Sequence, residues 1–200
     1  GPDGRAVRHP CRMSLNDATQ QGPLQAAIID LDGTLVDTLA DFTVAVNAML
    51  AELDLPALAA DRVERMVGKG SEHLIRSALT AVGGDAADLD QAWAAYQRHY
   101  REVNGRHARV YAGAREGLVR LRGQGLKLAC VTNKPQAFAE ALLAAKELRG
   151  FFDVVFGGDA VGQRKPHPMP LHRACEALGS PPGRTLVVGG SVDGARAARA

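Results

Sequence analysis

Long apolar segments and charge of one sign are both scarce in this chain of 200 residues. No run approaches the roughly 20 apolar residues that a membrane-spanning helix needs, so we expect no membrane partner. The formal net charge is +2 and no basic run breaks the balance, so nucleic acid is not expected as a partner either. The residues are 46% hydrophobic, which suits one compact domain with a small inserted subdomain.

Cysteine is also rare, with only Cys11, Cys130 and Cys175. Their odd number and wide spacing argue against a disulfide framework and against a zinc site. We expect Cys130 and Cys175 to be small buried hydrophobic residues, and we expect the protein to be cytoplasmic. Residues 1–24 are polar and rich in Gly and Pro, which predicts a disordered arm and no signal peptide.

Short apolar runs alternate with helical patterns in the second half of the chain. This alternation predicts an α/β fold with a doubly wound parallel sheet. A similar apolar run opens the ordered part of the chain, and such runs are typical of strands buried on both faces. The predicted strands are residues 26–29, 126–131, 151–158 and 185–190, and a final helical stretch is predicted up to Ala200.

An all-helical block interrupts this pattern between residues 40 and 108. Thr38 and Asp41 have the spacing of a capping box that opens its first helix. Further helices are predicted around 60–67, 71–81 and 85–103, and the last has Leu89, Trp93, Tyr96 and Tyr100 at helical spacing. We therefore expect a core made of residues 25–39 and 109–200, with residues 40–108 inserted after the first strand as an all-helical subdomain.

Polar residues follow the predicted strands at the edge where open α/β sheets bind ligands. Asp30 and Asp32 follow the first strand, and Thr132 and Asn133 follow the second. Lys165 lies in the loop after the third strand. Two like charges about 4 Å apart cost about 4 kcal/mol near a protein surface, so the aspartates predict a cation or a chemical role.

This set of side chains suits phosphoryl transfer. One carboxylate can act as a nucleophile, and a second can protonate the leaving oxygen and later deprotonate water. A hydroxyl, an amide and a lysine can hold the phosphoryl oxygens. Bound Mg²⁺ would remove the repulsion between Asp30 and Asp32.

The motifs "DLDGTLVD", "VTNK" and "KPHP", with "FFDVVFGGD" between the last two, resemble those of the haloacid dehalogenase superfamily from about residue 25 to the end. The resemblance implies that Asp30 is the nucleophile and Asp32 the general acid/base. It implies that Thr132, Asn133 and Lys165 bind phosphate and that Mg²⁺ sits on the Asp30 side chain and the Asp32 backbone oxygen. The helical block would be a mobile cap over a Rossmann-like core.

Within the superfamily, "LDGTLVDT", "MVGKG" and the overall layout resemble bacterial phosphoglycolate phosphatases. That resemblance makes a small phosphorylated metabolite the expected substrate, with 2-phosphoglycolate as the best candidate. In it, Lys69 lies on a cap loop that points into the site and contacts the substrate's carboxylate. A plain helix–helix turn is the alternative interpretation of this loop.

The last motif departs from the family pattern G-D-S-x-x-D, because this chain has "VVGGSVDGARAARA". Gly190 and Gly194 occupy the two acidic positions, and Asp193 lies one residue from the second and is the candidate third metal ligand. Three hypotheses follow: an Mg²⁺-dependent phosphatase, a degenerate protein that binds phosphate compounds without efficient turnover, and a phosphomutase. Family members usually continue with a further strand, so either the sheet lacks an edge strand or the chain is a fragment. The sequence does not predict the oligomeric state.

Overall fold

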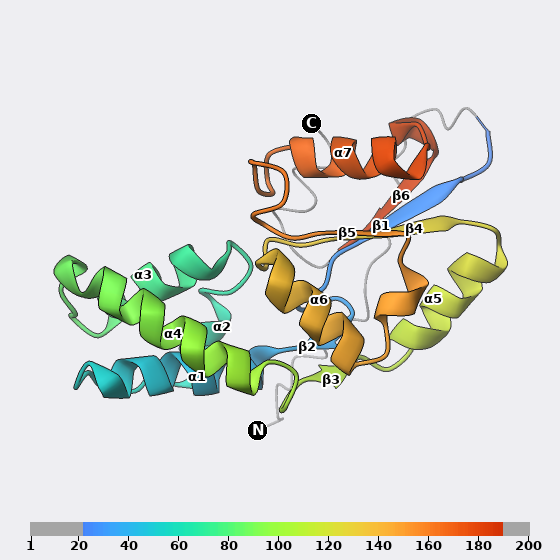
Figure 1. Ribbon diagram of the computed structural model, residues 1–200. Helices are drawn as coiled ribbons and strands as arrows, with labels where there is room; N and C mark the ends of the chain where they lie inside the picture. The colour runs from blue at the N-terminus through green and yellow to red at the C-terminus, as the bar shows by residue number, and fades with distance from the viewer. Residues whose placement is uncertain (1–21, 190–200) are drawn as a thin grey trace, which may run out of the picture.

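The computed structural model describes residues 22–189, which form a sheet-based part and a helical part lying side by side (Figure 1). We call the helical part, residues 40–108, the cap, and the remaining described residues the core. The doubly wound α/β fold predicted from the sequence is confirmed. Among the described residues, no helix is both long and apolar enough to cross a membrane.

The sheet of the core is parallel and places its first strand in an inner position. Its strands are β1 (Ala26–Ile29), β4 (Lys127–Val131), β5 (Val154–Phe156) and β6 (Thr185–Val188), in the order β5-β4-β1-β6. Every residue of β1 is buried, which explains why this strand is an uninterrupted apolar run. The residue after β1 therefore emerges near the middle of the sheet's carboxyl edge.

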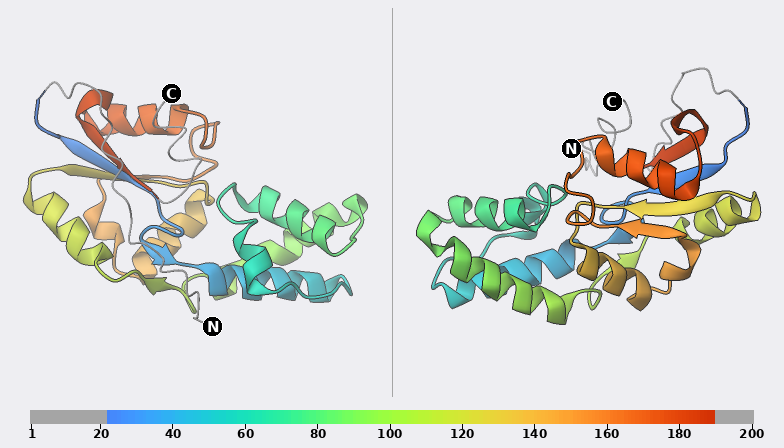
Figure 2. Two further views of the ribbon diagram at one scale, coloured as in Figure 1. Left: turned by 180° about the vertical axis from the view of Figure 1, so that it is seen from behind. Right: turned by 45° about the horizontal axis from the view of Figure 1, so that its top comes forward.

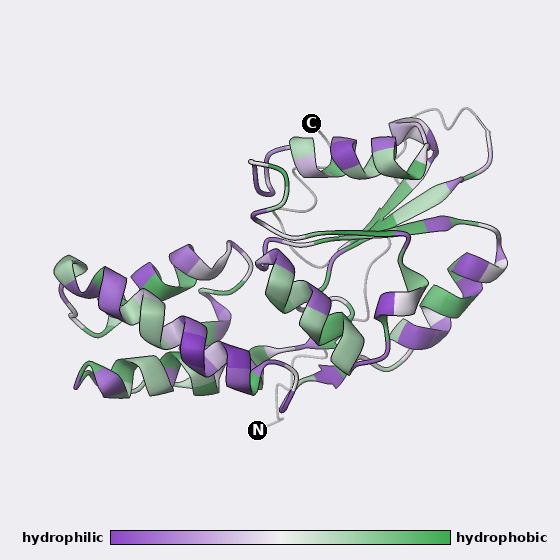
Figure 3. Ribbon diagram, viewed as in Figure 1, coloured by the Kyte–Doolittle hydropathy of each residue, from purple (hydrophilic) through white to green (hydrophobic). Residues whose placement is uncertain are grey.

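Helices cover both faces of this sheet (Figures 1 and 2). α7 (Met169–Leu178) packs on one face, whereas α5 (Ala114–Gly123) and α6 (Gln136–Ala145) lie on the other. Successive strand residues point to opposite faces, so Ile28 joins the cluster under α7 and Ile29 joins the cluster under α5 and α6. Figure 3 shows the resulting pattern, with hydrophobic strands between helices whose hydrophilic residues lie outward.

The cap has an apolar cluster of its own, built by α1 (Leu39–Glu52), α2 (Ala60–Glu64), α3 (Ser71–Ala81) and α4 (Leu89–Val103). Short 3₁₀ helices span Ala86–Asp88, Arg149–Phe151 and Pro182–Arg184. The chain enters and leaves the cap through β2 (Val36–Asp37) and β3 (Arg109–Val110), which pair antiparallel. The two segments that connect core and cap are thus hydrogen-bonded to each other. This two-residue pairing is too short for the sequence pattern to predict.

Several predicted boundaries were wrong. The helix expected over 60–67 ends at Glu64, and the strand expected over 151–158 is limited to β5 because a 3₁₀ turn precedes it. Trp93 has the spacing of the buried tyrosines of α4 but is 36% exposed, since the helix packs there through Ala92 and Ala95. The helical stretch predicted up to Ala200 lies outside the described residues.

The predicted capping box at the start of α1 was also wrong. Thr38 precedes the helix but its side chain caps no backbone N–H, because its Oγ1 donates to Asp32 Oδ1 at 2.8 Å. Asp41 is fully buried, and its carboxylate accepts the N–H groups of Gly105 and His107, each at 2.8 Å. Both side chains therefore make tertiary hydrogen bonds, and Asp41 ties the entry to the cap to its exit.

We predict that Asp41→Ala destabilises the protein by about 3 kcal/mol, because a buried carboxylate that accepts two backbone N–H groups is lost and a hydrogen bond to a charged group contributes about 1.5–3 kcal/mol. Urea denaturation followed by circular dichroism measures the change. Asp61→Ala on α2 is the matched control, since Asp61 is exposed. A change of less than about 0.5 kcal/mol for Asp41→Ala, the range typical of surface substitutions, would contradict the role given to this carboxylate.

Candidate active site

Asp30 is held at the carboxyl edge of the sheet by its backbone. Its N–H donates to the carbonyl of Val188 at 3.0 Å, which extends the pairing of β1 with β6 by one residue. Its Oδ1 accepts the N–H of Leu31 at 2.8 Å and lies 3.1 Å from Nζ of Lys165. The Asp30 side chain is 13% exposed and that of Lys165 is 5% exposed, so this ion pair is shielded from bulk water.

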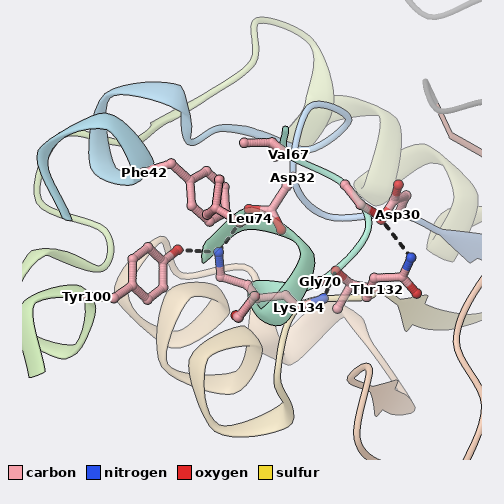
Figure 4. A pocket seen from close by; sticks show the side chains of 12 residues that line it. Asp30, Asp32, Phe42, Val67, Gly70, Leu74, Tyr100, Thr132 and Lys134 are labelled. Atoms are coloured by element: carbon pink, nitrogen blue, oxygen red, sulfur yellow. Dashed lines mark hydrogen bonds and ion pairs between the residues drawn. The ribbon is translucent and has the colours of Figure 1, made fainter. Parts of the chain in front are cut away.

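Asp32 lies in the same pocket but has a different cation (Figure 4). Its Oδ1 accepts from Thr38 Oγ1 at 2.8 Å and from Lys134 Nζ at 2.9 Å. The two aspartates are thus near each other, as the sequence predicted, and each is paired with its own lysine. Separate ion pairs offset the repulsion that the sequence led us to expect.

Lys134 is the main site residue that the sequence did not single out. Its side chain is 2% exposed, and its ammonium group donates to the hydroxyl of Tyr100 as well as to Asp32. Nζ lies 4.4 Å from the ring centroid of Phe42 and 4.6 Å from that of Tyr100, within cation–π range. The one signal in the sequence was that Lys134 directly follows Thr132 and Asn133. This signal is weak, because a lysine at the start of a helix is usually solvated.

Burial, with a smaller contribution from the charge of Asp32, holds the pKa of Tyr100 well above its usual value. The phenol is therefore neutral at physiological pH and accepts a hydrogen bond from Lys134 as a hydroxyl group. Its ring stacks on Phe42 with centroids 5.3 Å apart and meets Phe138 of α6 edge-on at 4.8 Å. Tyr100 is thus a cap residue fixed against both cap and core aromatic rings.

Thr132 and Asn133 follow β4 and have different surroundings. Thr132 Oγ1 accepts the N–H of Lys134 at 3.1 Å, which leaves the hydroxyl proton free to donate into the pocket. The amide of Asn133 donates to the carbonyls of Gly68 and Lys165 and accepts the N–H of Lys165. Asn133 therefore positions Lys165 and the cap loop, and its predicted contact with phosphate stays a prediction.

A tight approach of the loop after β5 depends on glycine. A Cβ on Gly158 would lie 2.2 Å from the carbonyl oxygen of Asn133, far closer than any real contact. Only glycine lets this loop pass against the segment that carries Thr132, Asn133 and Lys134. The "GGD" at residues 157–159, directly after β5, is therefore required sterically at Gly158.

The cap loop of residues 68–70 closes one side of the pocket, which Gly68 and Gly70 line. Gly70 has φ +92°, and a Cβ there would lie 2.6 Å from Nη1 of Arg164, so the loop packs directly against the segment that leads to Lys165. Lys69 between the two glycines is exposed and is not among the residues that line the pocket. Its predicted contact with a substrate carboxylate stays a prediction.

The donor set at this edge suits Mg²⁺, which binds hard oxygen ligands through one or two carboxylates and keeps several waters. Asp30 and Asp32 supply such oxygens on one pocket wall. Among residues 22–189, no three His, Cys, Asp or Glu side chains cluster tightly enough to hold an ion by themselves. Asp193, the predicted third ligand, and Gly190 and Gly194 lie outside the described residues.

The protein is thus a capped α/β protein. It has a doubly wound sheet with two acid–lysine pairs at the carboxyl edge, and a helical cap lies beside that edge. The family model of haloacid dehalogenase-like hydrolases matches residues 24–200, and the chain belongs to this family. The resemblance inferred from the motifs is thereby confirmed.

Named relatives narrow the comparison. The chain is 44% identical over 181 residues to a phosphoglycolate phosphatase of Nitrosospira multiformis, covering 89% of this chain and 80% of the relative. It is 44% identical to a plasmid-encoded phosphoglycolate phosphatase of Cupriavidus necator, covering 92% and 80%. Among solved structures, a predicted phosphoglycolate phosphatase from Haemophilus somnus matches with a TM-score of 0.85 at 29% identity, covering 90% and 82%. CbbY from Rhodobacter sphaeroides in complex with phosphate matches with a TM-score of 0.75 at 26% identity, covering 88% and 82%.

Proposed function

We propose that this chain is a phosphate-monoester hydrolase that acts on a small phosphorylated metabolite through a phosphoryl group carried on Asp30. The observation that supports it most is the placement of Asp30 beside Lys165 and Thr132, with a second acid, Asp32, in the same pocket. A nucleophile, phosphate-binding donors and a proton carrier are the parts that this reaction needs.

In the first step, an oxygen of Asp30 attacks phosphorus and the bond from phosphorus to the leaving oxygen breaks. Asp32 starts this step protonated and gives that proton to the leaving oxygen, so the alcohol departs neutral and Asp32 becomes a carboxylate. The ammonium group of Lys165 and the hydroxyl proton of Thr132 stabilise the charge that develops on the phosphoryl oxygens. In the second step, Asp32 removes a proton from water, which attacks the phosphoryl group and frees Asp30.

The side chain of Asp30 and the backbone oxygen of Asp32 would hold Mg²⁺ with the help of Asp193, so the Asp32 carboxyl group would remain available for proton transfer. When bound, the ion supplies charge neutralisation between the anionic nucleophile and the anionic substrate. Lys165 already neutralises Asp30 in part, so the two cations would share this task.

The relatives named phosphoglycolate phosphatase support 2-phosphoglycolate as the substrate. Its short carboxylate-bearing alcohol would occupy the side of the pocket formed by the cap, where Phe42, Val67 and Leu74 lie with the loop of residues 68–70. Lys69 on this loop is the cationic residue of the cap that we propose contacts the substrate's carboxylate when substrate is bound in the pocket.

We predict that Asp30→Asn lowers kcat for 2-phosphoglycolate by about 10⁴-fold or more, since an amide cannot accept the phosphoryl group. Release of inorganic phosphate measures the loss, and circular dichroism checks that the fold is retained. Asp37→Asn is the matched control because Asp37 is an exposed carboxylate on β2. Turnover of Asp30→Asn near that of the unchanged protein would refute the nucleophile.

We predict that Asp32→Asn slows turnover by about 10²–10⁴-fold and accumulates phosphorylated protein, because the water of the second step loses its base. 4-Nitrophenyl phosphate is the suitable substrate, since its leaving group departs without a proton and the first step stays fast. Mass spectrometry of quenched samples detects the added phosphoryl group. If no phosphorylated protein forms while turnover is lost, the two-step role of Asp32 is wrong.

We predict that a chelator abolishes phosphate release and that added Mg²⁺ restores it. Activity that is insensitive to chelator would contradict the metal requirement. A protein that is inactive with Mg²⁺ and becomes active in Gly190→Asp would instead support the degenerate phosphate-binding hypothesis. Product analysis separates the phosphomutase hypothesis, because a mutase moves the phosphoryl group to another hydroxyl and releases none.

A further inference from the structure

Lys134 is a core residue whose surroundings are supplied largely by the cap. It follows β4, but its ammonium group lies 4.4 Å from the ring centroid of Phe42 on α1 and 4.6 Å from that of Tyr100 on α4, two rings that stack on each other, and it donates to the Tyr100 hydroxyl. Its other partner is Asp32 Oδ1, at 2.9 Å. A residue of the core thus joins the second acid of the site to two helices of the cap (Figure 4).

The contacts of Asp32 are divided between its two oxygens. Oδ1 accepts from both Thr38 and Lys134, and among the described residues Oδ2 has no hydrogen-bond partner. Two donors on one oxygen fix the plane of the carboxyl group and leave the other oxygen to face the pocket. A hydrogen bond from Thr38 alone would not fix this plane, because the carboxyl group of Asp32 could still rotate about that single bond.

Lys165 provides a contrast within the same pocket. Its backbone is held by Asn133, and its ammonium group binds Asp30, so both contacts are made by the core. Lys134 alone of the two depends on α1 and α4 for its surroundings. If the cap moved away, Lys134 would lose two aromatic faces and a hydroxyl acceptor, whereas Lys165 would keep its partners.

We propose that Lys134 is a positioning residue that orients Asp32 for proton transfer to the leaving oxygen only when Phe42 and Tyr100 of the cap enclose it. The inference rests on the proposed function, in which Asp32 is the general acid/base. It adds that the proton-transfer step, and not phosphoryl binding, is the step coupled to the position of the cap.

The test compares a leaving group that needs a proton with one that does not. We predict that Lys134→Met lowers kcat for 2-phosphoglycolate by about 10²-fold and lowers the formation of phosphorylated protein from 4-nitrophenyl phosphate by less than about threefold. Tyr100→Phe should shift the same ratio in the same direction by a smaller factor. Lys127→Met is the matched control, because Lys127 is exposed at the opposite end of β4.

A double-substitution cycle provides a readout that a purely structural role would not give. In an Asp32→Asn background, Lys134→Met should lower kcat for 2-phosphoglycolate by less than about threefold further, since the group that it orients is already gone. Full additivity of the two losses would overturn the proposal. An equal loss on both esters, or a higher KM for 2-phosphoglycolate at unchanged kcat, would overturn it as well, the latter by indicating a substrate-carboxylate contact.

The proposed function and this inference fail in different ways. A protein that hydrolyses both esters and requires Asp30, but whose Lys134→Met variant keeps the ratio of the two rates, overturns the inference alone. A protein that releases phosphate from neither ester overturns the proposed function and the inference with it. Should Lys134→Met not fold, Tyr100→Phe decides the matter, since it removes one hydroxyl and retains the ring.

Discussion

Two carboxylates can share one partly buried pocket here because each has a lysine of its own. Asp30 pairs with Lys165 at 3.1 Å and Asp32 pairs with Lys134 at 2.9 Å. Removing one partner of a buried ion pair costs about 3–5 kcal/mol, since the remaining charge is left without compensation. The positions of both lysines therefore constrain the loops around the sheet's carboxyl edge, and much of the surrounding structure serves to place them.

The segment after β4 contributes three consecutive residues with three different tasks. Thr132 lines the pocket and accepts the N–H of Lys134, Asn133 binds the backbones of Lys165 and Gly68, and Lys134 reaches the cap. Gly158 allows the neighbouring loop to pass close to this segment. One turn thus connects the core, the cap loop and the acid pair, and a displacement there would disturb all three.

The sequence predicted those parts of the fold and site that depend on local pattern. The uninterrupted apolar run of β1 predicted a strand buried on both faces, and the polar residues after β1 and β4 predicted which side chains meet at the edge of the sheet. Contacts between distant segments were not predictable in this way. Thr38 and Asp41 matched a helix cap, but Asp32 and the N–H groups of Gly105 and His107 compete for them successfully. The role of Lys134 could not be predicted from the sequence, because its aromatic neighbours lie 34 or more residues away along the chain.

The two lysines divide the pocket into a side built by the core and a side shared with the cap. Asp30, Lys165 and Thr132 are all core residues, and the ion pair of Asp30 with Lys165 and the hydrogen bonds of Asp30 and Thr132 are made with other core residues. Asp32 is also a core residue, but the ammonium group beside it contacts the stacked rings of Phe42 and Tyr100 in the cap. An ammonium group in contact with aromatic rings and shielded from water interacts more strongly with a carboxylate than an exposed one does. In the proposed mechanism, cap position would therefore act more directly on Asp32, the proposed general acid/base, than on Asp30, the proposed nucleophile.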